Sequence, residues 1–242
     1  MISIIIPLYN QADKISACLW SIKNQTYANY EILVINDRST DKLSKIMKQF
    51  KDELGYKIKF YHNQENHGAP YSRNKGFRYS KGEFIFFCDA DAVLKENALE
   101  TMLETLRIHN EASFVYPNHR WGFKTMRLFP FDAEKLKKMP YIHTMALIRR
   151  KHFPAAGWDE NLKKLQDWDL WLTMLEEGHR GVWIDKVLFS IKPGGTMSSW
   201  LPSISYKIFP FLPAVKKYNR AVELIKKKHN LFGNSPVRTK ND

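Results

Sequence analysis

Short apolar runs alternate with segments of helical spacing through the first 110 residues. The runs are rich in Ile, Val and Phe, and they predict buried strands at 2–9, 30–37, 57–63 and 83–89. Between and after them, apolar residues recur three and four positions apart and predict helices at 12–24, 40–54, 69–80 and 96–110. Strands with few polar positions, each followed by a helix, indicate a mostly parallel sheet covered on both faces.

The second half of the chain has a less regular pattern. It predicts strands at 112–117, 143–150 and 181–191, and a helix at 166–178 that Gly178 ends. The basic, aromatic stretch 118–131 is expected to be a long mobile loop. Within the first half, Asp41 is expected to be a cap or a dipole partner of the helix that begins near it.

The composition limits the classes of protein to which the chain can belong. With 242 residues and 44% hydrophobic composition, it is long enough for one sizeable core. The 38 basic and 25 acidic residues give a net charge of +13, which favours an anionic partner. The N-terminus lacks the features of a signal peptide, and no apolar run approaches the ~20 residues that span a bilayer. Cys18 and Cys88 are expected to be buried free thiols, compatible with the cytoplasm.

Polar residues follow the predicted strands of the first half. In parallel sheets, ligands bind outside the carboxyl ends of the strands. These ends carry Tyr9, Asn10, Asn36, Asp37, Asn63, Asp89 and Asp91. The pattern therefore predicts a binding site at this edge of the sheet.

Asp89 and Asp91 stand one residue apart after the apolar run "FIFF". In an extended segment both side chains point to the same face, where they can share Mg²⁺ or Mn²⁺ together with substrate phosphates. The same Asp-Ala-Asp sequence also suits a solvated turn with capping acids. A motif this short is weak evidence for a metal site.

Three other residues have both a functional and a structural interpretation. Asp37 can accept a hydrogen bond from a nucleobase, or it can bond its own turn. Arg73 can reach an anion at the start of the 69–80 helix, or it can be an ordinary surface residue. Asp167 shares a helix face with Leu170 and Trp171, which suits an inward general base, although Asp is also common as a helix cap. Asp169 aligns with the other face of that helix.

Several motifs together resemble those of family-2 glycosyltransferases with the GT-A fold, over residues 2–199. They occur in the family's order as "SIIIPLYN", "LWSIKNQTYANYEILVINDRSTD", "ENHGAPYSRNKGF", "GEFIFFCDAD" and "GWDENLKKLQDWDLWL". The resemblance implies an α/β, Rossmann-like sheet flanked by helices. It also implies metal-dependent, inverting transfer of a sugar from a nucleotide-sugar, expected to be a UDP-sugar, to a hydroxyl of a glycan or a lipid-linked acceptor.

The resemblance also implies roles for individual residues. Asp167 matches the catalytic base, Asp37 the acid that bonds the nucleobase, and Arg73 an arginine near the diphosphate. Asp91 matches the direct ligand of Mn²⁺ or Mg²⁺, and Asp89 the acid near the ribose and the metal. The remaining matches lie in two loops. Those bordering the base and ribose are Pro7, Tyr9 and Asn10, and those lining the sugar and acceptor side are Trp158, Asp159 and Glu160.

The chain departs from the family pattern at several positions. Asn36 replaces the first acid of a pair, Ser72 an alanine, Gln166 a glutamate and Thr173 an arginine. The closing segment "FSIKPGGTMSS" lacks the usual histidine, and Lys192 is expected to supply charge to the diphosphate instead.

The expected organisation is a catalytic domain at 1–205, with a nucleotide-binding half at 1–110 and an acceptor-binding half at 111–205. A basic, aromatic tail follows at 206–242. Such a tail suits the anionic cytoplasmic face of a membrane, and it equally suits a helix packed on the domain.

Two other functions are weighed against the glycosyltransferase. A sugar-phosphate nucleotidyltransferase needs a Gly-rich loop after the first strand, which "PLYNQADK" lacks. A basic nucleic-acid-binding module gives no reason for acids at the strand ends, so no nucleic-acid partner is expected.

Overall fold

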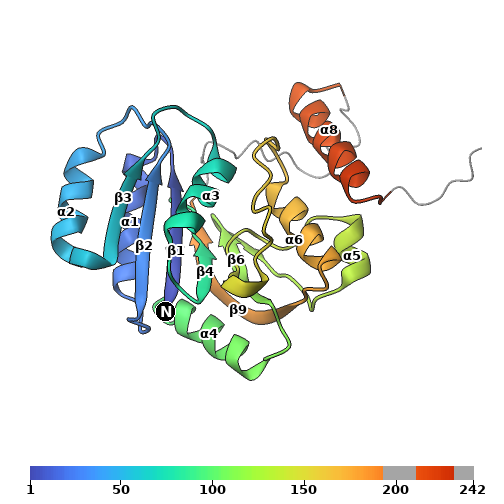
Figure 1. Cartoon of the computed structure of the whole chain (residues 1–242), viewed down its shortest axis with the longest axis horizontal. Coiled ribbons are helices and arrows are strands. Elements are labelled where there is room, and N and C mark those ends of the chain that lie inside the picture. Colours follow the sequence, from blue (N-terminus) through green and yellow to red (C-terminus); the bar gives the residue numbers. More distant parts are fainter. Residues whose placement is uncertain (193–210, 232–242) are drawn as a thin grey trace, which may run out of the picture.

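The computed structural model describes residues 1–192 and 211–231, and in that part of the chain nine strands form one curled sheet (Figure 1). Their order is β3-β2-β1-β4-β8-β6-β9-β5, with β7 paired to β6. The strands are β1 (Ile2–Leu8), β2 (Tyr30–Asn36), β3 (Ile58–His62), β4 (Phe84–Phe87), β5 (Ala92–Leu94), β6 (Phe114–Trp121), β7 (Lys124–Met126), β8 (Leu147–Arg149) and β9 (Gly181–Ile191).

Helices cover both faces of this sheet. The α-helices are α1 (Ala12–Lys23), α2 (Ser44–Leu54), α3 (Ala69–Tyr79), α4 (Ala98–Ile108), α5 (Ala133–Lys138), α6 (Gln166–Glu176) and α8 (Pro213–Lys228). Two single-turn 3₁₀ helices are η1 (Gly55–Lys57) and η2 (Arg150–His152). The α/β fold class expected from the sequence is therefore confirmed.

The sheet is parallel in its first half and mixed in its second. β1 pairs in parallel with β2 and β4, and β2 pairs in parallel with β3. Beyond β4, strand β8 is antiparallel to both of its neighbours, whereas β6 and β9 run parallel. Helices connect the first four strands, and such crossovers keep strands parallel. The mostly parallel arrangement thus holds where strands and helices alternate in the sequence.

Alternate side chains of each strand feed two apolar cores, one on each face of the sheet. Ile4 and Ile6 of β1 belong to the core that includes α1, α2 and α4. Ile5, between them, belongs to the core that includes α5 and α6. Because both faces are covered, β1 and β2 can be apolar at nearly every position, which is the pattern that made them recognisable in the sequence.

The packing of α3 on the sheet depends on Gly76. A methyl group at this position would come within 2.4 Å of the Ile5 side chain and 3.4 Å of the Ile35 side chain. The absence of a side chain lets α3 lie close against β1 and β2. This close approach places the first turn of α3, and with it Arg73, over the carboxyl ends of the strands.

Two expectations about local structure are wrong. The stretch 118–131 is not a long mobile loop, because β6 continues to Trp121 and pairs with β7 through a turn at Gly122. The cross-strand pairs of this hairpin are His119–Met126, Arg120–Thr125 and Trp121–Lys124, and the basic composition concealed them. Asp41 does not cap α2, which begins at Ser44. Its Oδ2 instead accepts a hydrogen bond from the Ala12 N–H at the start of α1, at 2.7 Å.

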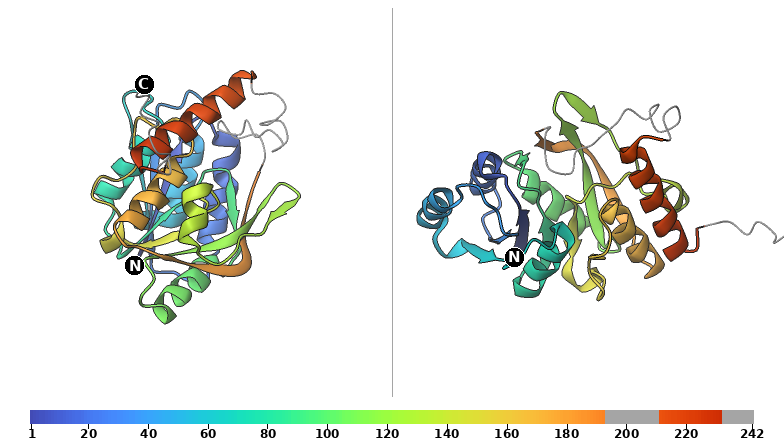
Figure 2. Two further views of the ribbon diagram at one scale, coloured as in Figure 1. Left: turned by 90° about the vertical axis from the view of Figure 1, so that its right-hand side faces the viewer. Right: turned by 90° about the horizontal axis from the view of Figure 1, so that it is seen from above.

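The helix α8 lies across α6, although the two helices are far apart in the sequence (Figure 2). Its apolar face, formed by Val215, Ala221 and Ile225, is buried. The part of the expected tail that is described therefore packs on the domain. No described helix is long and apolar enough to cross a membrane. Cys18 and Cys88 are buried free thiols, as expected.

Candidate active site

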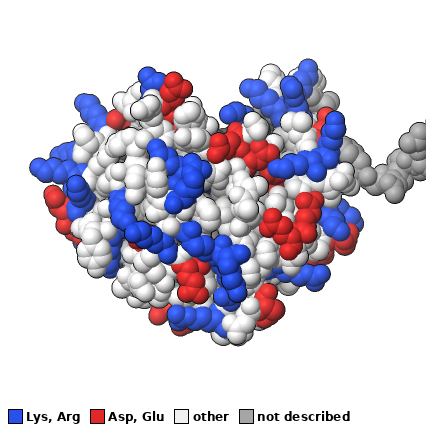
Figure 3. Space-filling view, viewed as in Figure 1, with Lys and Arg blue, Asp and Glu red and all other residues white. Residues whose placement is uncertain are grey.

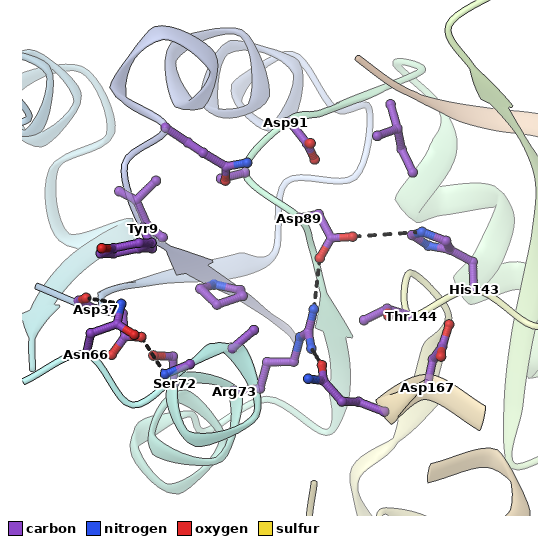
Figure 4. Close-up of a pocket in the computed structure, with 18 of the residues that line it drawn as sticks. Tyr9, Asp37, Asn66, Ser72, Arg73, Asp89, Asp91, His143, Thr144 and Asp167 are labelled. Carbon is purple, nitrogen blue, oxygen red and sulfur yellow. Dashed lines mark hydrogen bonds and ion pairs between the residues drawn. The ribbon is translucent and has the colours of Figure 1, made fainter. Parts of the chain in front are cut away.

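A cavity of about 410 Å³ lies at the carboxyl ends of β1, β2 and β4 (Figure 4). Polar residues that follow these strands converge there because parallel strands end at the same edge of a sheet. The expected site residues that line it are Pro7, Tyr9, Asp37, Arg73, Asp89, Asp91 and Asp167. Asp37 and Asp167 lie on opposite sides of the cavity, with Asp89 and Arg73 between them.

Asp37 is almost fully buried and organises the loop that leads into α3. Its Oδ1 accepts hydrogen bonds from the Asn63 side chain at 2.7 Å and from the His67 N–H at 3.0 Å. Its Oδ2 accepts one from the Gly68 N–H at 2.7 Å. Gly68 has φ +93°, a conformation that favours glycine, and α3 begins directly after it. Asp37 therefore joins the carboxyl end of β2 to the start of α3, where both elements border the cavity.

Arg73 is 2% exposed and is held on three sides. Its Nη2 donates to Asp89 Oδ1 at 3.1 Å, and its Nη1 donates to Gln166 Oε1 at 3.3 Å. The guanidinium also lies 4.7 Å from the centre of the Trp158 ring, a cation–π contact. Arg73 is therefore a fixed cation at the cavity wall and not an ordinary surface residue. Gln166, at the position where the family pattern has a glutamate, provides Arg73 with a neutral acceptor.

Asp89 and Asp91 both face the cavity from the segment after β4. Burial, and next to it the charge of Asp89, raise the pKa of Asp91 to about 6. Two carboxylates at close range fit Mg²⁺ or Mn²⁺, whose remaining ligands are then water and phosphate oxygens. Residues 1–192 and 211–231 contain no group of three His, Cys, Asp or Glu that could hold a metal. Of the expected closing segment at 189–199, the seven residues 193–199 lie outside the described residues.

Asp167 lies in the first turn of α6, after Leu165 in a left-handed conformation with φ +58°. One carboxylate oxygen accepts a hydrogen bond from the Trp168 N–H at 2.9 Å. Trp168 and Trp171 anchor this turn by donating their indole N–H groups to the Leu136 and Ile142 carbonyls. Burial raises the pKa of Asp167. A half-buried carboxylate of raised proton affinity at a cavity wall has the properties of a general base.

His143 is a cavity residue that the sequence interpretation missed. It lies 3.8 Å from Asp89, measured from Nε2 to Oδ2, and burial lowers its pKa. A lone histidine has no recognisable spacing with other residues. It is one of eight histidines scattered along the chain, and only the fold brings it opposite Asp89.

Five residues expected near the site do not line the cavity. Asn10 accepts a hydrogen bond from the Thr40 N–H, and the Lys192 N–H donates to the Asp91 carbonyl. Trp158 is buried beneath Arg73, and Glu160 accepts a hydrogen bond from Asn74 at 2.8 Å. Their described contacts support the cavity wall.

The fifth residue, Asp159, takes part in a charge cluster with the C-terminal helix. Lys228 Nζ lies 2.8 Å from Asp159 Oδ2 and 2.8 Å from Asp169 Oδ1. His229 bonds Asp169 through Nε2 and Glu176 through Nδ1, both at 2.9 Å. The sequence pattern placed Asp169 on the face of α6 that is turned away from the apolar residues. Asp169 is nevertheless buried, because α8 covers this face. The cluster joins α8 to α6 at Asp169, which is two residues after Asp167 in the same helix.

The family model for glycosyl transferase family 2 matches residues 3–155, more than half of the chain. The chain belongs to this family. The matched segment contains β1, α3 and β4, and hence the cavity residues from Pro7 to His143. Membership excludes neither a metal nor a particular donor, but it gives no support to the nucleotidyltransferase or nucleic-acid interpretations.

Curated relatives of this family-2 chain include bacterial glycosyltransferases. An uncharacterized glycosyltransferase of Haemophilus influenzae is 28% identical over 192 residues, which cover 73% of this chain and 63% of that protein. WfgD of Escherichia coli, a UDP-Glc:α-D-GlcNAc-diphosphoundecaprenol β-1,3-glucosyltransferase, is 38% identical over 119 residues, 49% of this chain and 46% of its own. The matches thus span less than two thirds of these relatives' lengths.

Solved structures with a similar fold include two nucleotide-sugar complexes. TarS 1–349 of S. aureus with UDP-GlcNAc has a TM-score of 0.71 and 18% identity, covering 96% of this chain and 73% of that one. The mannosyltransferase PcManGT of Pyrobaculum calidifontis with GDP-Man and Mn²⁺ has a TM-score of 0.66 and 17% identity, covering 95% and 69%. At these identities the likeness establishes the GT-A fold of the chain.

Proposed function

We propose that the protein is an inverting, metal-dependent glycosyltransferase that uses a UDP-sugar. One observation carries this proposal, namely that Asp37, the Asp89–Asp91 pair and Asp167 surround a single cavity. A nucleoside at the Asp37 end would place its diphosphate beside Arg73 and Asp91. The sugar would then extend towards Asp167. The UDP-sugar donor of WfgD and the nucleotide-sugars of TarS and PcManGT support the choice of a nucleotide-sugar donor.

In the proposed reaction, Asp167 is the general base. An acceptor hydroxyl attacks the anomeric carbon on the side opposite the nucleoside diphosphate, and the bond from that carbon to the diphosphate oxygen breaks. Asp167 takes the hydroxyl proton as the new bond forms. This single displacement inverts the anomeric centre and requires no covalent bond to the protein. The raised pKa of Asp167 favours proton acceptance.

Fixed positive charge would stabilise the departing diphosphate. Arg73 is held in place before any substrate arrives, so its charge requires little reorganisation during the reaction. The open N-terminal turn of α3 adds its dipole on the same side. Asp91 and Asp89 would hold Mg²⁺ or Mn²⁺, which when bound offsets the charge of the diphosphate. Lys192 is proposed to contribute charge beside Asp91.

The acceptor is proposed to be a glycan or lipid-linked hydroxyl that approaches past Asp167. The lipid-linked acceptor in WfgD's description supports this choice. We also retain the proposed division into a catalytic domain at 1–205 and a tail at 206–242. Within the domain, 1–110 would bind the nucleotide and 111–205 the acceptor.

The outward face of α8 is proposed to dock on an anionic membrane at the cytoplasmic side. Lys and Arg side chains gather over this helix in Figure 3. Lys216, Lys217, Arg220 and Lys227 are exposed, and Phe211 beside them is 63% exposed. Such a basic face is attracted to acidic lipids.

Liposome sedimentation tests this docking with the full chain. Replacement of Lys216, Lys217 and Arg220 by glutamine should abolish binding to phosphatidylserine vesicles while leaving the buried face of α8 intact. Binding that persists unchanged in this variant would remove the proposal.

A thermal-shift screen tests the proposed donor. UDP-, GDP- and dTDP-sugars with Mn²⁺ are each added to the full chain, and a UDP-sugar is expected to raise the melting temperature most. A shift with GDP- or dTDP-sugars alone would show that the donor carries a nucleobase other than uracil. No shift with any of the sugars would refute the proposed function. Release of UDP in the presence of an acceptor glycan then measures transfer.

A further inference from the structure

His143 points into the cavity from the segment before β8, on the side near Asp167 (Figure 4). Its ring is packed from behind by His119 and Phe189, with ring centres 4.9 Å and 5.5 Å away. The imidazole is therefore a fixed group that presents one edge to the cavity. Neither the nucleoside end nor the proton transfer proposed above uses it.

The hydrogen bonds of His143 identify which ring nitrogen is the donor. The Met145 N–H donates to Nδ1 at 3.1 Å, so Nδ1 acts as an acceptor. A neutral imidazole with an accepting Nδ1 carries its proton on Nε2. Nε2 is the atom that faces Asp89. His143 consequently presents an N–H donor to the cavity, aimed at a carboxylate.

Asp89 presents a complementary acceptor across a short gap. Its Oδ1 is bonded to Arg73, and its Oδ2 lies 3.8 Å from His143 Nε2. That distance is too long for a hydrogen bond. The side chains of His143 and Asp89 are 20% and 25% exposed, so a ligand in the cavity can reach both atoms. A hydroxyl group suits this gap, because its oxygen accepts from Nε2–H while its own hydrogen is donated to Oδ2.

We propose that His143 is a specificity-determining residue that binds a hydroxyl of the transferred sugar together with Asp89. This inference rests on the proposed function, since Asp37 and Asp167 define which end of the cavity holds the sugar. A site built to hydrogen-bond a hydroxyl discriminates against sugars that lack it or present it in the other configuration. His143 would thereby help to select among UDP-hexoses.

Calorimetric titration of the full chain tests the role of His143. UDP, UDP-glucose, UDP-galactose, UDP-GlcNAc and UDP-GalNAc are titrated at constant Mn²⁺ into the unaltered protein, His143→Phe and His143→Gln. His143→Phe retains an aromatic ring but loses the N–H, and it should weaken binding of the preferred UDP-sugar about fivefold to tenfold. Its affinity for UDP should stay unchanged. His143→Gln keeps an N–H donor and should recover part of the loss and of the preference among sugars.

Comparison of UDP with the UDP-sugars distinguishes the possible roles of His143. Equal loss of UDP and UDP-sugar affinity in His143→Phe would place the contact at the ribose or diphosphate and overturn the inference. Unchanged affinity for every ligand would overturn it as well. Failure of the unaltered protein to bind UDP would instead refute the proposed donor class. Because retained UDP binding reports a folded site, misfolding of His143→Phe cannot imitate the expected result.

Discussion

Arg73 and Asp89 form an ion pair of 3.1 Å at the wall of the cavity, and Arg73 is almost fully buried. The pair joins α3 to the segment after β4, and the bond from Arg73 to Gln166 extends the connection to α6. One guanidinium thus links the elements that carry the proposed diphosphate, metal and base positions. Its planar group with several donors suits this task better than a lysine.

Loss of Arg73 should destabilise the folded protein as well as the site. Arg73→Met keeps apolar contact with Trp158 but removes the bonds to Asp89 and Gln166. We expect the free energy of unfolding to fall by about 1–3 kcal/mol, because bonds to charged groups are lost in a buried setting. Urea denaturation measures this change. A variant of full stability would contradict the central structural role of Arg73.

Asp167→Asn should separate chemistry from binding. The amide cannot accept the proton, so transfer should fall by roughly 100- to 10,000-fold. Affinity for UDP should remain within about twofold, since Asp167 lies at the opposite end of the cavity from Asp37. Initial rates of UDP release and titration of UDP check the two parts. Undiminished transfer, or loss of UDP binding together with transfer, would contradict the assignment of Asp167 as the base.

The attachment of α8 should weaken as the pH rises above neutrality. Burial opposes the charge of His229, but hydrogen bonds to Asp169 and Glu176 outweigh it and raise the pKa of His229 above its usual 6.5. The stabilisation is therefore complete below pH 6.5 and is lost as the pH rises through the higher value in the folded state. Lys228 and Asp159 complete the cluster, and hydrogen bonds to Asp159 and Asp169 raise the pKa of Lys228 despite its burial.

Denaturation measured from pH 6 to 9 tests the contribution of His229. The unaltered protein should lose on the order of 1 kcal/mol across this range through His229, and His229→Gln should lack that part of the slope. His109→Gln is a matched control, because His109 is exposed and pairs only with exposed Glu111 among its described ion pairs. Identical slopes for His229→Gln and the unaltered protein would contradict the charged state assigned to His229.

Gly76→Ala should loosen α3 from the sheet. The added methyl group would overlap the Ile5 side chain at 2.4 Å, and Ile5 has little room to move within its core. We expect a loss of about 1–3 kcal/mol in unfolding free energy, measured by urea denaturation. The double variant Gly76→Ala with Ile5→Leu removes the Cγ2 methyl that the new methyl group would overlap. It should recover part of the loss, and an additive further loss would show that steric contact is not the cause.

The first half of the fold could be predicted because its sequence pattern is local. β1 and β2 are apolar on both faces, and the apolar residues of the helices in this half recur at regular spacing. The type of each element, and the edge of the sheet that carries the site, could therefore be predicted from this pattern. The second half could not be predicted to the same extent. β8 is only three residues long, and the continuation of β6 beyond Pro117 is basic, so both depend on pairing with distant strands.

The residues of the candidate site that belong to recognisable motifs could be predicted. Asp37, Arg73, Asp89, Asp91 and Asp167 lie together as the motif order implied. Trp158, Asp159 and Glu160 lie behind the cavity wall, because Asn74 of α3 and Lys228 of α8 bind that loop. His143 could not be recognised, since its importance comes only from the position of its ring opposite Asp89.

Titration of UDP into the full chain, with and without Mn²⁺, tests whether the cavity binds a nucleotide together with a metal ion. UDP should bind when Mn²⁺ is present, and removal of the metal or the variant Asp91→Asn should weaken binding by roughly tenfold or more. Asp132→Asn, which alters only a helix cap on α5, should bind UDP as the unaltered protein does. UDP affinity that changes with neither Mn²⁺ nor Asp91, or no binding of UDP at all, would rule out metal-dependent nucleotide binding in this cavity.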